Sequence, residues 1–102
     1  MEKITEKTFA EKISSGVVMV ACTAKWCQPC KIQKPILETL SAQKKDLTIF
    51  TLDIDEEPEV ATMYDVASIP TFIWFVDGEL RQKDFGVKKA TELLSIFEKL
   101  KS

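Results

Sequence analysis

The chain contains no histidine among its 102 residues. A Ser-His-Asp triad, a Cys-His dyad and a histidine-containing zinc site are therefore excluded. Histidine is also the side chain that ordinarily titrates near neutral pH, so chemistry at that pH needs a perturbed Cys, Asp, Glu or Lys. Because the chain has three cysteines, cysteine is the first candidate for a reactive group.

Several other features are scarce. Three glycines and four prolines argue against disorder or a fibrous repeat. The apolar run from Val17 to Cys22 is far too short for a membrane span, and the charged first seven residues do not resemble a signal peptide. A net charge of −2 disfavours nonspecific binding of nucleic acid. We therefore expect a cytoplasmic protein that binds neither nucleic acid nor membranes, in a compartment where structural disulfides are rare.

The length and the hydrophobic pattern predict one α/β domain over residues 1–102. Apolar runs and turn residues predict strands over 17–22, 47–54, 71–76 and 79–85, the last two joined by an Asp77-Gly78 hairpin turn. Helical spacing predicts helices over 8–15, from near Cys27 to about 43, over 56–64 and over 88–101. The order is roughly β-α-β-α-β-α-β-β-α, which indicates a central mixed sheet of four to five strands flanked by helices.

The feature that points to chemistry is Cys27-Gln28-Pro29-Cys30, a C-x-x-C between a buried strand and a helix. A tetrathiolate zinc site needs a second cysteine pair, and an iron–sulfur pattern lacks its fourth cysteine here. Thiol–disulfide exchange is the alternative, because free amides and the positive end of the helix dipole stabilise a thiolate at Cys27. Cys30 lies one turn further along, so it can close a small ring with the same sulfur.

Other short motifs occur at a spacing typical of one family. They are Lys25-Trp26-Cys27-Gln28-Pro29-Cys30-Lys31 followed by Pro35, Leu52-Asp53-Ile54-Asp55 with Pro58, Ile69-Pro70-Thr71-Phe72, Asp77-Gly78 and Phe85-Gly86. With these motifs the chain resembles the thioredoxin family over nearly its whole length. The resemblance implies the thioredoxin fold and a protein-disulfide reductase that also serves as a redox carrier in electron transport.

The resemblance also implies roles for particular residues. Cys27 would attack a substrate disulfide as the nucleophile, and Cys30 would resolve the mixed disulfide. Ile69 and Pro70, joined by a cis peptide bond, would face the cysteines and bind substrate together with Trp26. The intervening residues of the motif, Gln28 and Pro29, would tune the reduction potential.

The same resemblance sets expectations for partners and cofactors. Disulfide-containing proteins are the expected substrates, and a thioredoxin reductase is the expected electron donor. We expect a monomer that needs no metal and no bound organic cofactor.

The chain departs from the family pattern at three places. Gln28 stands where thioredoxins usually have Gly. Ala21 and Thr51 stand where the family carries a buried Asp and its Lys neighbour, so we hypothesise that water or a partner's carboxylate takes the proton of Cys30. Cys22 occupies a position that is often Phe, and we expect it to be a small core residue rather than an auxiliary thiol.

Three alternative functions stay open at the level of sequence. Gln28 permits a more oxidising or isomerase-like redox protein. A non-catalytic binding module with the same fold is a second alternative, although the presence of both Cys27 and Cys30 argues against it. An iron or copper carrier is the third.

Overall fold

The computed structural model describes all 102 residues, and its element order matches the predicted one. The strands are β1 (Glu2–Lys3), β2 (Val17–Thr23), β3 (Thr48–Asp53), β4 (Thr71–Val76) and β5 (Glu79–Phe85). The helices are α1 (Phe9–Lys12), α2 (Gln28–Gln43), α3 (Pro58–Met63) and α4 (Ala90–Lys101). The first strand, whose range the sequence did not define, is only two residues long.

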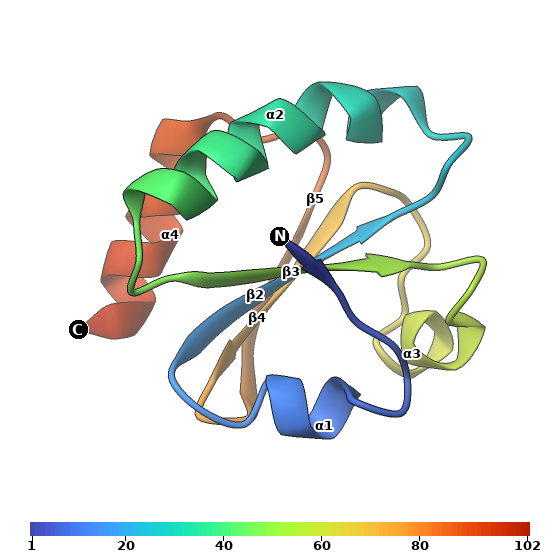
Figure 1. Cartoon of the computed structure of the whole chain (residues 1–102), viewed down its shortest axis with the longest axis horizontal. Helices are drawn as coiled ribbons and strands as arrows, with labels where there is room; N and C mark the ends of the chain where they lie inside the picture. The colour runs from blue at the N-terminus through green and yellow to red at the C-terminus, as the bar shows by residue number, and fades with distance from the viewer.

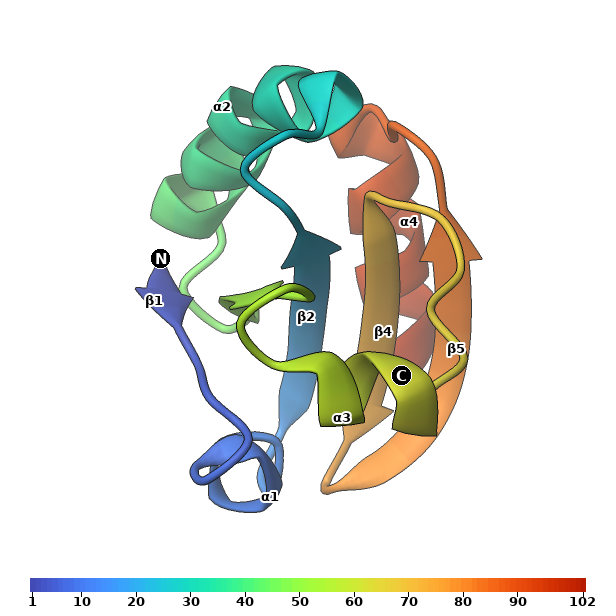
Figure 2. The ribbon, with the colours of Figure 1, turned by 90° about the vertical axis from the view of Figure 1, so that its right-hand side faces the viewer.

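The five strands form one mixed sheet in the order β1-β3-β2-β4-β5. The β1, β3 and β2 strands run parallel, whereas β4 is antiparallel to β2 and β5 is antiparallel to β4. Helices α2 and α4 cover one face of the sheet, and α1 and α3 cover the other (Figure 1, Figure 2). The predicted mixed sheet flanked by helices is therefore confirmed.

The turn between β4 and β5 has the backbone that its sequence predicts. Asp77 and Gly78 both have positive φ, at 50° and 85°. Two successive left-handed residues make the turn whose twist matches that of a hairpin, and Asp-Gly is a preferred pair for it. The Asp77 carboxylate also accepts the amide N–H of Gly16 at 2.8 Å, so the turn is tied to the loop that precedes β2.

The core consists of two layers of side chains, one on each face of the sheet. Successive residues of a strand point to opposite faces. Val18, Val20 and Cys22 therefore pack towards α1 and α3, while Met19 and Ala21 pack towards α2 and α4. This arrangement explains why the β2 sequence is apolar without alternation: both faces of the strand are buried.

Helix α2 buries one stripe of side chains, and this stripe does not coincide with the apolar residues of the helix. The buried side chains are Cys30, Gln33, Leu37 and Leu40. Ile32 is apolar but 61% exposed, because it lies off this stripe. Pro35 lies inside α2, where its ring removes one backbone donor.

Gln33 is the polar member of the buried stripe and joins α2 to the segment before α4. Its side-chain Nε2 donates to the carbonyl oxygen of Lys88 at 3.0 Å, and its Oε1 accepts the Lys88 amide at 2.7 Å. Both polar atoms of this buried amide are therefore satisfied by one backbone residue. The pair fixes α2 one turn after Cys30.

Replacing Gln33 should destabilise the fold although the replacement is apolar. In Gln33→Met both backbone groups of Lys88 lose their partner, and we expect the free energy of unfolding to fall by about 1–3 kcal/mol. Equilibrium unfolding in urea measures the change. The matched control is Gln43→Met at the exposed end of α2, which should stay within about 0.5 kcal/mol of the unchanged chain. Equal stability of the two variants would contradict the proposed tie.

Candidate active site

The two cysteines of the C-x-x-C motif lie where the chain passes from β2 into α2. Cys27 is the N-cap of α2, with an extended backbone, and Cys30 lies in the first turn. The two residues form a disulfide. The amide N–H of Cys30 donates to Sγ of Cys27 at 3.2 Å, so an N-terminal amide of the helix points at this sulfur. Pro29 is tolerated here because the first-turn amides have no partner within the helix.

The segment before β4 meets the cysteines although it is far from them in sequence. The Ile69–Pro70 peptide bond is cis, as the family resemblance implied. The carbonyl oxygen of Ile69 lies 3.8 Å from Sγ of Cys27, and the Ile69 side chain packs against the small cluster of Ala24, Cys27 and Cys30. The antiparallel pairing of β4 with β2 places this segment next to the motif.

Trp26 lies on the surface beside the disulfide. Its side chain is 66% exposed. The indole Nε1 donates to Oδ2 of Asp55 at 2.8 Å, which holds the ring in one orientation. Gln28 and Pro29 are also exposed, whereas Cys27 and Cys30 are buried. Trp74, the second tryptophan, is fully buried in the core, as its place in a strand predicted.

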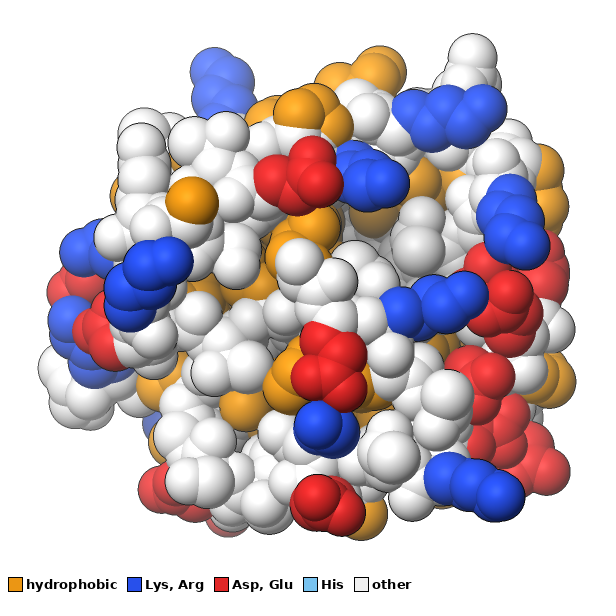
Figure 3. Space-filling model, in the orientation of Figure 1, with side chains coloured by type: hydrophobic (Ala, Val, Ile, Leu, Met, Phe, Trp, Pro, Cys, Tyr) orange, Lys and Arg blue, Asp and Glu red, His pale blue; other side chains and the backbone are white.

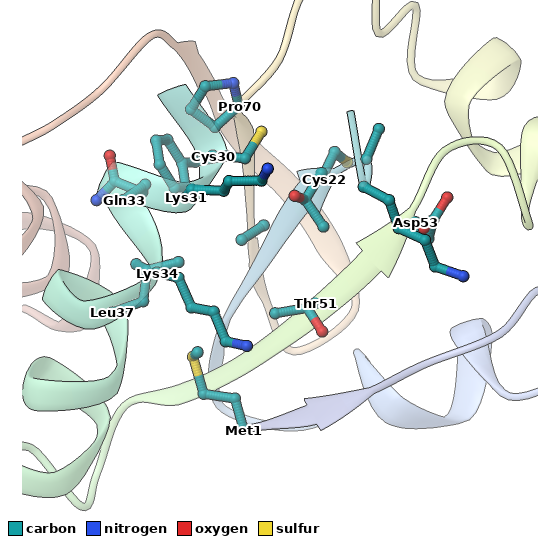
Figure 4. Close-up of a pocket in the computed structure, with 15 residues that line it drawn as sticks. Met1, Cys22, Cys30, Lys31, Gln33, Lys34, Leu37, Thr51, Asp53 and Pro70 are labelled. Carbon is teal, nitrogen blue, oxygen red and sulfur yellow. The ribbon is translucent and has the colours of Figure 1, made fainter. Parts of the chain in front are cut away.

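A cavity of about 300 Å³ lies on the other side of Cys30, between α2 and the sheet. Ala21 and Thr51, which are paired across β2 and β3, line it. These are the positions where the resemblance implied a buried Asp and Lys. Figure 4 shows α2 residues such as Cys30 and Lys34 on one side, and Thr51 and Asp53 of β3 on the other. The missing pair has therefore left an open space under the disulfide.

Charged side chains near the site are mostly paired on the surface. Acidic side chains gather beside α3 (Figure 3). Glu56 forms ion pairs with Lys3 at 2.8 Å and with Lys25 at 3.7 Å. The Glu56 carboxylate raises the pKa of Lys3 by hydrogen bonding and charge. The described residues contain no group of three or more Cys, Asp or Glu side chains arranged to hold a metal ion.

Two features of the site were not predicted from sequence. One is the partner of Trp26, since Asp55 is 29 residues away along the chain. The other is the cavity. The sequence held a signal for the Trp26 partner. Asp53 and Asp55, separated by one residue, lie at the end of a strand that is parallel to β2. The ends of parallel neighbours meet at one edge of the sheet, so acidic groups there come close to the motif.

The third cysteine, Cys22, lies in the core and outside this site. Its side chain is fully buried on the opposite face of β2, with α1 and α3. Burial in apolar surroundings raises the pKa of the Cys22 thiol to about 12. The structure confirms the prediction that Cys22 is a small core residue.

Cys22 should resist alkylation until the chain unfolds. At pH 8 the shift from the ordinary value of 9.0 to about 12 lowers the thiolate fraction about 1000-fold. In the oxidised protein, Cys22 is the one free thiol, so peptide mass spectrometry after iodoacetamide treatment reports on it alone. We expect no labelling in buffer and complete labelling in urea. Rapid labelling of the folded protein would contradict the assignment.

The strand–helix C-x-x-C, its disulfide and the facing cis-proline segment define the chain as a thiol–disulfide oxidoreductase. The Thioredoxin family model matches residues 1–99, and the chain belongs to the thioredoxin family. A thioredoxin from Chlamydia trachomatis is 38% identical over 99 residues, covering 97% of each chain. A thioredoxin from Staphylococcus aureus is 41% identical over 98 residues, covering 95% of this chain and 94% of the relative.

The solved structures agree with this family and with the thioredoxin fold. A mutant thioredoxin from Halobacterium salinarum superimposes with a TM-score of 0.90 at 27% identity, covering 100% of this chain and 90% of the other. No helix of the chain combines the length and the apolar character that crossing a membrane requires.

Proposed function

We propose that the chain reduces disulfides of other proteins, with Cys27 as the nucleophile and Cys30 as the resolving cysteine. The observation that carries the assignment is the hydrogen bond from the Cys30 amide to Sγ of Cys27 at 3.2 Å. After reduction of the disulfide, the same amide and the dipole of the 16-residue α2 favour a thiolate at Cys27. The Cys30 sulfur does not occupy the N-cap position, because Cys30 lies inside the first turn of α2.

The reaction then runs in two exchange steps. The Cys27 thiolate attacks one sulfur of the substrate disulfide, forming a mixed disulfide and releasing the first substrate thiolate. The Cys30 thiolate then attacks Sγ of Cys27, the bond from Cys27 to the substrate breaks, and the second substrate thiolate leaves. The substrate gains two electrons from the Cys27–Cys30 dithiol, its two thiolates take up protons from solution, and Cys27–Cys30 becomes the oxidised pair seen in the structure.

Trp26, Ile69 and Pro70 are the proposed substrate-binding residues. The exposed indole of Trp26 offers apolar surface beside the sulfur, and its bond to Asp55 keeps that surface in place. Ile69 and Pro70 lie at the start of β4, next to Cys27, where their backbone is suited to an extended substrate segment. The exposed Gln28 and Pro29 separate the two cysteines in the sequence, so we assign them the tuning of the reduction potential.

The proposed cycle needs an external electron donor, because the oxidised pair cannot reduce a second substrate. We propose a thioredoxin reductase for this step, in the cytoplasm, where the dithiol contributes to cell redox homeostasis and electron transport. The thiols supply the reacting groups, so the cycle requires no metal and no bound organic cofactor. We propose that the chain acts as a monomer, with the motif open to large substrates.

The roles of the cysteines can be separated by serine variants in an insulin reduction assay with dithiothreitol. We expect acceleration by the unchanged chain and by Cys22→Ala, the matched cysteine control. Cys27→Ser should lose the acceleration, because no nucleophile remains. Cys30→Ser should accumulate a mixed disulfide through Cys27, visible as a mass increase that reductant removes. If the folded, unaltered chain does not accelerate insulin reduction, the reductase assignment is wrong. The redox equilibrium of Cys27 and Cys30 against glutathione would then test the more oxidising role.

Truncating Trp26 should weaken the binding of protein substrates more than the binding of small substrates. For Trp26→Ala we expect KM for insulin to rise about three- to tenfold, a loss of roughly 1 kcal/mol of apolar contact. The rate with a small aromatic disulfide should change less than twofold, because that reagent needs little surface. Met63→Ala, an exposed apolar residue on α3, is the matched control. Equal loss with both substrates would assign Trp26 to the chemistry at Cys27 rather than to binding.

A further inference from the structure

Cys30 faces two different environments. On one side its sulfur is bonded to Cys27, and the residue is 7% exposed at the molecular surface. On the other side it lines the cavity of about 300 Å³ beneath α2. A space of this size holds several water molecules where polar groups line it. The cavity is therefore a route by which a proton can reach or leave Cys30 without passing the bound substrate.

The proposed resolving step, on which this inference rests, requires a proton acceptor for Cys30. The Cys30 thiol must lose its proton before its sulfur attacks Cys27. Among the residues that line the cavity, Asp53 carries the single carboxylate. The other ionisable side chains there are those of Lys25, Lys31, Lys34 and Cys22. Lysine amines are protonated at neutral pH and cannot accept a proton, and Cys22 points to the opposite face.

Asp53 is placed to receive a proton on one particular oxygen. The residue is 6% exposed, at the end of β3 and opposite Thr23 of β2. Its Oδ1 accepts the amides of Asp55 at 2.8 Å and Glu56 at 3.1 Å. These bonds fix the carboxylate and leave Oδ2 without a donor from the protein. Side chains at alternate strand positions share a face, so Ala21, Thr51 and Asp53 border the same space.

The remaining walls of the cavity include the small Ala21 of β2 and two lysines of α2. Ala21 is small and leaves the space open, whereas a longer side chain at this position would fill it. In Figure 4 the amine of Lys31 extends from the Cys30 side of the cavity, and that of Lys34 extends towards Thr51 and Met1. Both lysines belong to the wall of the cavity that α2 forms.

We propose that Asp53 accepts the proton of Cys30 through water in this cavity. The thiol proton passes to a water molecule, which gives a proton to Oδ2 of Asp53. The Cys30 thiolate attacks Sγ of Cys27, the bond from Cys27 to the substrate breaks, and the substrate thiolate leaves with the electron pair. Asp53 then returns its proton to solvent past Lys34 and Met1. The role of Ala21 is to keep the path open.

The test uses the reduced, full-length chain and one equivalent of Ellman's reagent in a stopped-flow instrument. Attack by Cys27 releases a first thionitrobenzoate, and resolution by Cys30 releases a second, so one absorbance trace separates the two steps. In Asp53→Asn the side-chain oxygen can still accept the amides of Asp55 and Glu56. We expect an unchanged first phase and a second phase about tenfold slower at pH 7. The difference in second-phase rate between the variant and the unchanged chain should become smaller as the pH rises.

Two further variants separate a proton path from a structural role. Ala21→Leu fills the cavity without touching Asp53, so it should also slow the second phase, and the double variant should be no slower than the slower single variant. Ala42→Leu on the exposed part of α2 and Asp46→Asn on the surface are the matched controls, with both phases unchanged. Ala21→Leu also serves as the test if Asp53→Asn fails to fold.

The outcomes distinguish this proposal from the function on which it rests. The proton path alone is overturned if the unchanged chain shows both phases and the second phase of Asp53→Asn is equally fast from pH 6 to 8. Additive slowing in the double variant also overturns it, because the two sites would then act independently. Absence of the second phase in the unchanged chain overturns both the reductase assignment and the path.

Discussion

The site depends on one contact, the hydrogen bond from the Cys30 amide to Sγ of Cys27 at the start of α2. Helix N-termini hold amides without partners, and a sulfur placed there satisfies one of them while meeting the positive end of the dipole. A chain without histidine can therefore activate a thiol through its backbone alone. Placing Cys27 at the N-cap also sets Cys30 one turn further along, within reach of Cys27.

The rest of the fold keeps that helix terminus in place. β2 is buried on both faces and delivers the chain to Cys27 from the centre of the sheet. The buried Gln33 fastens α2 to the backbone of Lys88, so the helix cannot slide along the sheet without breaking two hydrogen bonds. The antiparallel β4 brings Ile69 against Cys27 from the other side. The sheet, α2 and the segment before β4 thus surround the sulfur of Cys27.

Beneath Cys30, uncharged residues stand where the family pattern has a buried Asp and Lys, and this changes which groups can act on Cys30. With Ala21 and Thr51 facing each other across two strands, the interior carries no ion pair but retains a cavity. Burying an unpaired charge is costly, so the absence of both partners avoids a penalty that the loss of one would cause. Cys30 and Asp53 both line this cavity, and the Asp53 carboxylate accepts two backbone amides.

The amino-acid sequence alone determined the strand and helix order, the hairpin turn, the reactive pair and the core role of Cys22, because these follow from local periodicity, turn chemistry and motif spacing. The family resemblance added the cis bond before Pro70, which local preferences do not predict. Only the tertiary structure decided that Ile32 faces solvent, that Gln33 holds Lys88, that Asp55 holds Trp26 and that a cavity joins Cys30 to Asp53. These features depend on which segments distant in sequence meet, and that depends on how the helices pack on the sheet.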